Sequence, residues 1–281
     1  FRSKWPTEYR YPDITYKHNI SFKCGDLTFN LHHARGETDD HTWIHVPEEK
    51  LIAPGDLFIW AVPNGGNPQK VQRYISDWAD ALEEMLKLDC EIFLPGHGFP
   101  ILGKKRIKKA LETTSKFLRS IEDQTLKLMN QGKSLNQVLH EVEIPNDLME
   151  LPWLTPIYDD PQFLIRMIWR RYGGWWDGEY DRLLPAPRKE EALAWVELSN
   201  GIDNIILKAL EHLDKGNLKV AAQLIETAFH ADNKNDQMHD ARAKIYREFS
   251  LKQSSSMGRN ILNHASMASA QGKRDLAQTE D

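Results

Sequence analysis

The sequence predicts an α/β fold over about the first 125 residues and an all-α fold after them. Before Gly103, short apolar runs alternate with turn residues around one run of helical spacing, and this alternation indicates helices packed on a sheet. After Gly103 the strand pattern stops and apolar residues recur only at helical spacing. We therefore predict one domain over 1–125, a helical domain over 126–270 and a disordered polar tail over 271–281.

The elements of the first half follow from local patterns. Gly25 and Asp26 form a turn pair inside a predicted β-hairpin over 14–32, because Leu27, Phe29 and Leu31 alternate on one face. The remaining predicted elements are a strand over 42–46, a strand that starts at Leu51 and stops at Gly55-Asp56, a helix over 71–88 and a strand over 91–94.

The second half is predicted to be helical throughout. A long helical pattern follows Gly103 and ends near Gly132, where glycine can serve as the C-terminal cap. Ser134 is a candidate N-cap and Pro161 a candidate first residue of a later helix. Three more helices are expected over 188–249, and one helix pair there resembles a tetratricopeptide unit without a second copy.

The composition excludes some classes of function. Hydrophobic residues make up 41% and charged residues 27% of the 281 residues, with a formal net charge of -5. The basic residues are dispersed, so we expect no nucleic-acid partner. The apolar runs are too short to predict a membrane span. Two cysteines predict no disulfide framework and leave the cellular compartment open.

Three polar residues stand beside a glycine at the end of an apolar run: Glu37, Asp56 and His97. A neighbouring glycine lets the backbone turn tightly, so that the carboxylate or imidazole can point into a cleft. Each residue taken singly could be an ordinary turn or cap residue. Together they favour a site for zinc or a similar divalent metal, which binds carboxylate oxygens and imidazole nitrogens.

The order and spacing of these three residues resemble the second half of a metallo-β-lactamase fold. Glu37 stands where that fold commonly carries a histidine. In this respect the chain resembles the type III alkyl sulfatases, in which a glutamate occupies that position. The run from Arg171 to Gly178 looks like the signature of the alkyl sulfatase dimerisation domain, and residues 123–132 fit its linking helix. The resemblance covers about residues 12–270.

This resemblance implies the C-terminal part of a metallo-β-lactamase domain, one half of its αββα architecture, followed by a helical dimerisation domain that forms a homodimer. It also implies two zinc ions, with Glu37, Asp56 and His97 among their ligands. A metal-activated water would then hydrolyse an alkyl sulfate or a similar small anionic ester.

The resemblance also indicates substrate contacts. Asn64 keeps the position of a sulfate-binding asparagine, whereas Gln69 and Tyr74 stand where two sulfate-binding arginines are expected, with Arg73 adjacent. We therefore predict Asn64, Arg73 and, from the helical half, Tyr172 as substrate contacts. His41 is predicted to hold Glu37 or a substrate group, although a surface role fits it equally well.

One feature of the family is missing from these residues. The family carries an upstream His-x-His-x-Asp-His loop with four metal ligands, and the 281 residues contain no such loop. We expect the chain to be a fragment whose upstream part carries that loop. The alternative is an inactive fragment or degenerate homologue that acts as a protein-association or dimerisation module.

Overall fold

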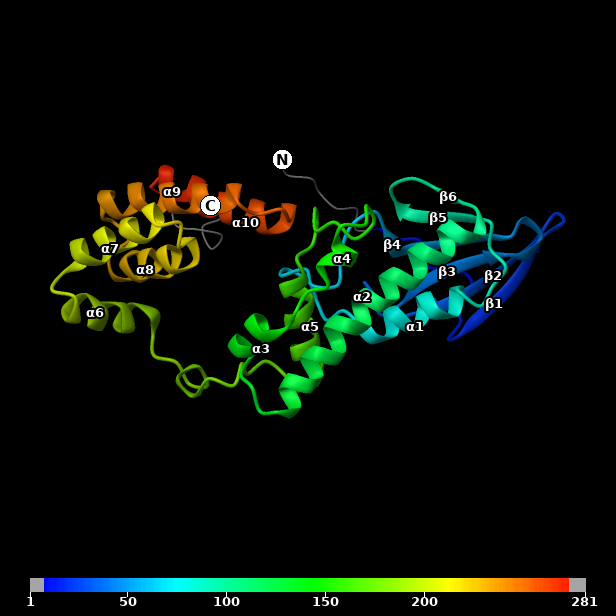
Figure 1. Ribbon diagram of the computed structural model, residues 1–281, viewed down its shortest axis with the longest axis horizontal. Helices are drawn as coiled ribbons and strands as arrows, with labels where there is room; N and C mark the ends of the chain where they lie inside the picture. The colour runs from blue at the N-terminus through cyan, green and yellow to red at the C-terminus, as the bar shows by residue number, and fades with distance from the viewer. Residues whose placement is uncertain (1–7, 273–281) are drawn as a thin grey trace.

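The computed structural model describes residues 8–272. Figure 1 shows a β-sheet covered on one face by α1 and α2, followed by a helical region. The strands are β1 (Asn19–Cys24), β2 (Leu27–Ala34), β3 (His41–Val46), β4 (Leu51–Ile59), β5 (Ile92–His97) and β6 (Ile101–Leu102). The α-helices are α1 (Ile75–Met85), α2 (Lys104–Asn130), α3 (Leu135–Glu141), α4 (Asn146–Met149), α5 (Pro161–Gly173), α6 (Arg188–Leu198), α7 (Ile202–Asp214), α8 (Leu218–Ala231), α9 (Asp236–Leu251) and α10 (Ser256–Ala270). The predicted fold class, α/β followed by all-α, is confirmed.

Within residues 8–272 the strands form one six-stranded sheet in sequential order. Neighbouring strands are antiparallel except β4 and β5, which are parallel and are joined through α1. The predicted hairpin is confirmed, because Cys24 pairs with Leu27 and leaves a two-residue turn between them. Gly25 in that turn has a φ of 61°, which glycine adopts without strain.

The strand that begins at Leu51 does not stop at Gly55 as predicted. β4 continues to Ile59, and its register with β5 shifts on both sides of Gly55, whose φ is 56°. The glycine therefore marks an irregularity inside the strand rather than its end. The residues after Asp56 are buried apolar side chains, which explains why the strand continues.

The predicted helix over 71–88 is also shorter than expected. α1 begins only after Tyr74, which is its N-cap. Arg73 is drawn into a buried contact with Glu37, and the Gln72 amide donates to the Met167 carbonyl in α5. These tertiary contacts hold residues 72 and 73 outside the helix, although their spacing fits one.

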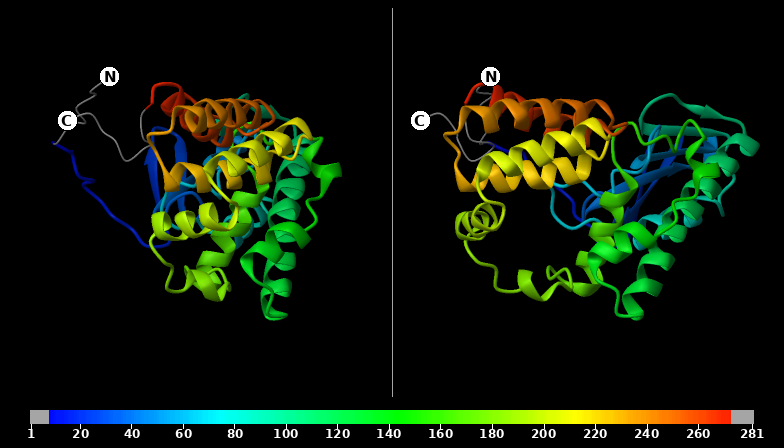
Figure 2. Two further views of the ribbon diagram at one scale, coloured as in Figure 1. Left: turned by 90° about the vertical axis from the view of Figure 1, so that its left-hand side faces the viewer. Right: turned by 60° about the vertical axis from the view of Figure 1, so that its left-hand side comes forward.

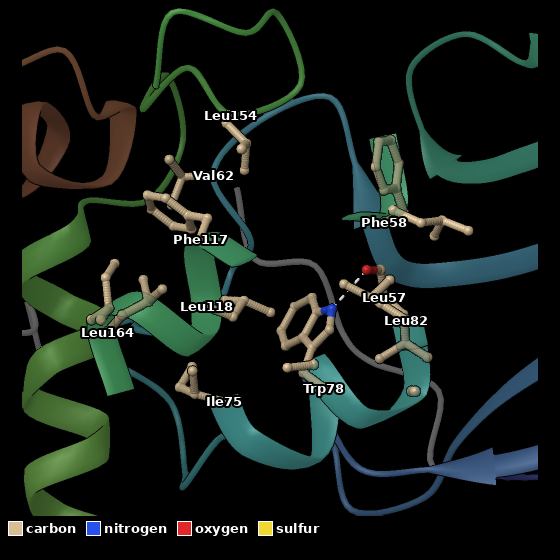
Figure 3. Close-up of a cluster of buried hydrophobic side chains, with 14 of the residues drawn as sticks. Leu57, Phe58, Val62, Ile75, Trp78, Leu82, Phe117, Leu118, Leu154 and Leu164 are labelled. Carbon is tan, nitrogen blue, oxygen red and sulfur yellow. Dashed lines mark hydrogen bonds between the residues drawn. The ribbon is translucent and has the colours of Figure 1, made fainter. Parts of the chain in front are cut away.

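The main core lies between the sheet, α1, α2 and α5. Trp78 of α1 is fully buried at its centre, where its indole Nε1 donates to the Leu57 carbonyl over 2.6 Å. Figure 3 shows this bond together with the surrounding side chains, among them Leu118 from α2 and Leu164 from α5. Burial of so large an aromatic side chain stabilises the contact between the helices and the sheet.

The helical half agrees with its predicted caps. Ser134 forms a capping box at the start of α3, Pro161 is the first residue of α5, and Gly132 follows α2 with a φ of 76°. The predicted domain boundary after residue 125 falls inside α2. Of the predicted tail over 271–281, residues 273–281 lie outside the described range.

The buried apolar residues form two separate clusters. The first joins the sheet to α5, and the second lies among α7, α8 and α9. Figure 2 shows α7 to α10 gathered in a bundle. Among the described residues, the helices lack the combination of length and apolar character that a membrane span requires.

Candidate metal and anion site

Asp56 and His97 face each other at neighbouring parallel strands. Asp56 lies on β4 and His97 is the last residue of β5, and the two strands are paired over this region. The Asp56 Oδ1 and His97 Nε2 atoms are 3.4 Å apart. Both side chains are open to solvent, with 36% of Asp56 and 74% of His97 exposed. The strand pairing therefore places a carboxylate and an imidazole side by side at an accessible position.

Glycine at position 96 makes this approach possible. A Cβ atom there would lie 2.1 Å from the Asp56 Oδ1 atom, which is closer than nonbonded atoms come. Gly98 has a φ of 97°, and a Cβ atom there would lie 2.1 Å from the Trp60 indole. The two glycines that flank His97 thus let the β5 end pass directly over Asp56 and Trp60.

The chemistry of this pair fits a divalent metal. Zinc binds imidazole nitrogen and carboxylate oxygen at about 2.0–2.2 Å, so tetrahedral geometry places two ligands about 3.3–3.5 Å from each other. The observed 3.4 Å between Asp56 and His97 lies in this range. Residues 8–272 contain no group of three or more His, Cys, Asp or Glu side chains arranged to hold a metal. The pair therefore has a separation that suits two ligands of one metal ion, and no third ligand lies with it in the described part of the chain.

Glu37 lies in a different polar cluster. Its Oε1 atom accepts a hydrogen bond from the Asn64 side-chain amide over 2.6 Å and lies 2.7 Å from the Arg73 Nη1 atom. Arg73 also donates to the Asn64 carbonyl. The structure thus joins three predicted site residues, Glu37, Asn64 and Arg73, into one cluster, which we call the Glu37 cluster.

The Glu37 cluster is buried, unlike the Asp56–His97 pair. Arg73 is 4% and Asn64 6% exposed, and the Glu37 side chain is 17% exposed. Two buried polar atoms in it, Asn64 Oδ1 and Arg73 Nε, have no hydrogen-bond partner. An acceptor and a donor left unpaired at this depth cost free energy, so the hydrogen bonds among the described residues satisfy this cluster only in part.

Among the described residues, His41 hydrogen-bonds to the backbone rather than to Glu37, one of the two groups it was predicted to hold. Its Nε2 atom lies 2.8 Å from the Pro54 carbonyl oxygen in β4. A Cβ atom at Gly55 would lie 2.8 Å from the same nitrogen, so glycine at 55 leaves room for the imidazole. His41 therefore lies against the strand that carries Asp56.

Tyr172 lies in another environment, near the end of α5. Its hydroxyl donates to Glu122 of α2 over 3.0 Å, and the Arg171 guanidinium lies over its ring. Burial and the bond to Glu122 raise the pKa of the Tyr172 hydroxyl. The structure pairs Tyr172 with Glu122 rather than with Asn64 or Arg73.

Asp159 is a buried acid next to the site that was not predicted from the sequence. It is fully buried, and its two oxygens accept hydrogen bonds from the backbone N–H groups of Gly66 and Asp160. Burial raises the pKa of Asp159 to about 7, opposed by those hydrogen bonds and by the charge of Arg73. Its main partner is 93 residues away in sequence, so no local pattern could reveal it.

The helical half matches a known family. A model of the alkyl sulfatase dimerisation family matches residues 134–272. The chain is alkyl sulfatase-like. A linear primary-alkylsulfatase from a Pseudomonas species is 24% identical to it over 84% of this chain. An alkyl/aryl-sulfatase from Saccharomyces cerevisiae, BDS1, is 26% identical over 70% of this chain.

Solved structures agree on the fold of this alkyl sulfatase-like chain. The stereoselective inverting sec-alkylsulfatase Pisa1 from Pseudomonas superposes with a TM-score of 0.88 at 22% identity, covering 94% of this chain and 43% of that one. At this identity the match shows a shared fold. The chain also spans only 45% of the Pseudomonas primary-alkylsulfatase and 31% of the yeast protein.

Proposed function

We propose that this protein is a zinc-dependent hydrolase that cleaves an alkyl sulfate or a similar small anionic ester. The observation that carries the proposal is the Asp56–His97 pair, whose 3.4 Å separation suits two ligands of one zinc ion. Similarity to alkyl sulfatases over most of the chain supports the substrate class. Glu37 is the third proposed ligand, and ligands outside the described residues would complete a site for two ions.

Bound zinc would polarise the ester and lower the pKa of water toward about 7. The residues of this chain orient the reacting groups around it. Asp56 and His97 present their ligand atoms from two hydrogen-bonded strands, which fixes their separation. Arg73 and Asn64 hold the Glu37 carboxylate in one orientation by a charge-assisted contact and a hydrogen bond.

The Glu37 cluster would also bind the anionic group of the substrate. The buried Arg73 Nε atom is a donor without a partner, and a sulfate oxygen is a suitable acceptor. The Asn64 side-chain amide and the Arg73 guanidinium both contact the Glu37 Oε1 atom. Tyr172 is a proposed contact from the helical half, and its hydroxyl would have to leave Glu122 to reach a substrate.

Turnover assays on the full-length native protein test this proposal. Decyl sulfate, decyl phosphate and decyl acetate are compared, and we expect hydrolysis of the sulfate to be the fastest. Asp56→Ala should abolish hydrolysis. The matched control is Glu112→Ala, which removes a half-exposed carboxylate on α2 and should leave the rate unchanged. Equal rates for Asp56→Ala and the wild type would refute the proposal.

A second candidate function is an association module without catalysis. Two observations favour it: the described residues contain no three-ligand metal group, and α6 exposes Trp195 and Leu198 at 54% and 75%. The dimerisation-family match supports a homodimer under either function. Sedimentation of a protein that is dimeric but neither binds zinc nor hydrolyses any ester would favour the module.

A further inference from the structure

The loop between β4 and α1 carries Asn64 and is enclosed by the protein. Its residues from Ala61 to Asn67 are all buried. The Asn64 side-chain amide donates a hydrogen bond to Glu37, and the Asn64 backbone carbonyl accepts one from Arg73. The position of this loop therefore sets where the polar atoms of the Glu37 cluster lie. We call residues 61–67 the Asn64 loop.

The Asn64 loop lies against the start of α5 in the dimerisation domain. A Cβ atom at Gly66 would lie 2.2 Å from the backbone carbon of Phe163, so the two main chains are in direct contact. The Gly66 N–H donates to Asp159 Oδ2 over 2.7 Å, and the Val62 N–H donates to the Thr155 carbonyl over 3.1 Å. Residues 155–159 thus hold the loop at both ends.

The other side of this segment is held by α10. The Ser256 N–H donates to the Ile157 carbonyl over 3.0 Å, and the Ser255 hydroxyl donates to the Tyr158 carbonyl over 2.8 Å. Ser255 is 1% exposed, so its hydroxyl is shielded from water on the donor side of the bond to Tyr158. Asp159 therefore lies between the C-terminal helical bundle and the Asn64 loop.

We propose that Asp159 is a positioning residue that couples the dimerisation domain to the site, by fixing the Asn64 loop and through it Asn64 and Glu37. Only a side chain with two acceptor oxygens can satisfy the N–H groups of Gly66 and Asp160 together. An amide at this position would direct its NH₂ group at one of those N–H donors. This inference rests on the proposed function in one respect, the membership of Asn64 and Glu37 in the reactive site.

Asp159→Asn in the full-length, zinc-loaded protein tests the inference by two measurements. The first is hydrogen exchange, in which we expect the peptide that covers residues 61–67 to exchange about tenfold faster than in the wild type, because one buried donor loses its acceptor. The second is steady-state turnover of decyl sulfate, in which KM should rise about tenfold and kcat change less than twofold. Zinc content should stay unchanged.

Asp160→Asn is the matched control. The Asp160 side chain caps α5 by accepting from the Gln162 N–H, and asparagine is an equally good N-cap. It should therefore alter neither the exchange of the Asn64 loop nor KM.

Unchanged exchange in the Asn64 loop of Asp159→Asn would overturn the inference. Faster exchange spread evenly over the whole molecule would also overturn it, because that result describes general destabilisation. If the wild type does not hydrolyse decyl sulfate, the proposed function fails, and the exchange measurement still decides the role of Asp159.

Discussion

The two halves of the candidate site differ in how their polar groups are satisfied. Asp56 and His97 are exposed. Among residues 8–272, neither side chain forms an ion pair within 4 Å with any residue except the other. Glu37, by contrast, is held by Asn64 and Arg73 in a buried cluster. The comparison shows that the Asp56–His97 pair is open to solvent, whereas protein groups already fix the Glu37 carboxylate.

This difference also separates stability from function. Removing a buried charge leaves its partner uncompensated at a cost of several kcal/mol, whereas exposed pairs contribute about 0–1 kcal/mol. Substitutions in the Glu37 cluster should therefore lower folding stability, and substitutions at Asp56 or His97 should leave it nearly unchanged while removing function. Four predictions test this contrast, from the largest expected effect on stability to the smallest.

Arg73→Ala should have the largest effect. It removes the guanidinium that contacts Glu37 and the Asn64 backbone carbonyl, and Arg73 is only 4% exposed. Loss of one partner of a buried ion pair costs about 3–5 kcal/mol. Urea unfolding measures the change. Arg73→Gln, which keeps donors near Glu37 without the charge, is the control and should recover part of the loss. A cost below about 1 kcal/mol would show that the pair is not desolvated.

Asp159 should make stability depend on pH. Its folded-state pKa of about 7 lies above the ordinary value of 3.8 because of burial, so the native state holds a proton that the unfolded chain releases between these values. Stability should therefore fall as pH rises from about 4 to 7, by a total on the order of 4 kcal/mol. The charged groups that act on this carboxyl are Arg73 and Asp160.

The measurement compares urea unfolding of the wild type and Asp159→Asn at several pH values. The variant has no titrating group at this position, so the stability difference between the two proteins should change over this range and become constant above pH 7. A difference that is the same at pH 4 and pH 7 would contradict the assigned pKa.

Gly66→Ala should destabilise the protein by about 1–3 kcal/mol, a typical cost of overpacking. The added methyl group would lie 2.2 Å from the Phe163 backbone and must displace the Asn64 loop. The matched control is Gly258→Ala in α10, where the nearest atoms lie at 3.7 Å. That variant should be neutral or more stable by up to about 1 kcal/mol. Thermal unfolding of both variants tests the contrast, and equal melting temperatures would contradict it.

Tyr172→Phe should have the smallest effect, about 1–2 kcal/mol, because it removes one partly buried hydrogen bond to the Glu122 carboxylate, whose side chain is 5% exposed. Urea unfolding checks this value. The same variant reports on the predicted substrate contact, since a rise in KM for decyl sulfate is expected only if the hydroxyl leaves Glu122 in the complex. An unchanged KM would remove Tyr172 from the proposed anion site.

The parts that were predictable from the sequence depend on local signals. The hairpin at Gly25, the cap at Ser134 and the helix that starts at Pro161 each follow from a few neighbouring residues. Asp56 and His97 each stand near a glycine in the sequence, but their 3.4 Å approach arises from the pairing of the parallel strands β4 and β5, with Asp56 inside β4 rather than at its end.

The parts that were missed depend on contacts distant in sequence. The helical spacing of residues 71–74 gave no sign that Arg73 would turn toward Glu37. The glycine at 55 indicated a strand end, although it serves as an irregularity within β4. Asp159 binds a loop almost a hundred positions earlier. Such contacts are set by the packing of α5 on the sheet and have no local sequence pattern.

Zinc analysis of the full-length protein tests the central claim most directly, namely that Asp56 and His97 are metal ligands. We expect about two zinc ions per chain in the wild type and clearly less zinc in the double variant Asp56→Ala/His97→Ala. The free energies of unfolding in urea of the two metal-free proteins should agree within about 0.5 kcal/mol. The same zinc content in the wild type and the double variant, or none in either, would contradict the account.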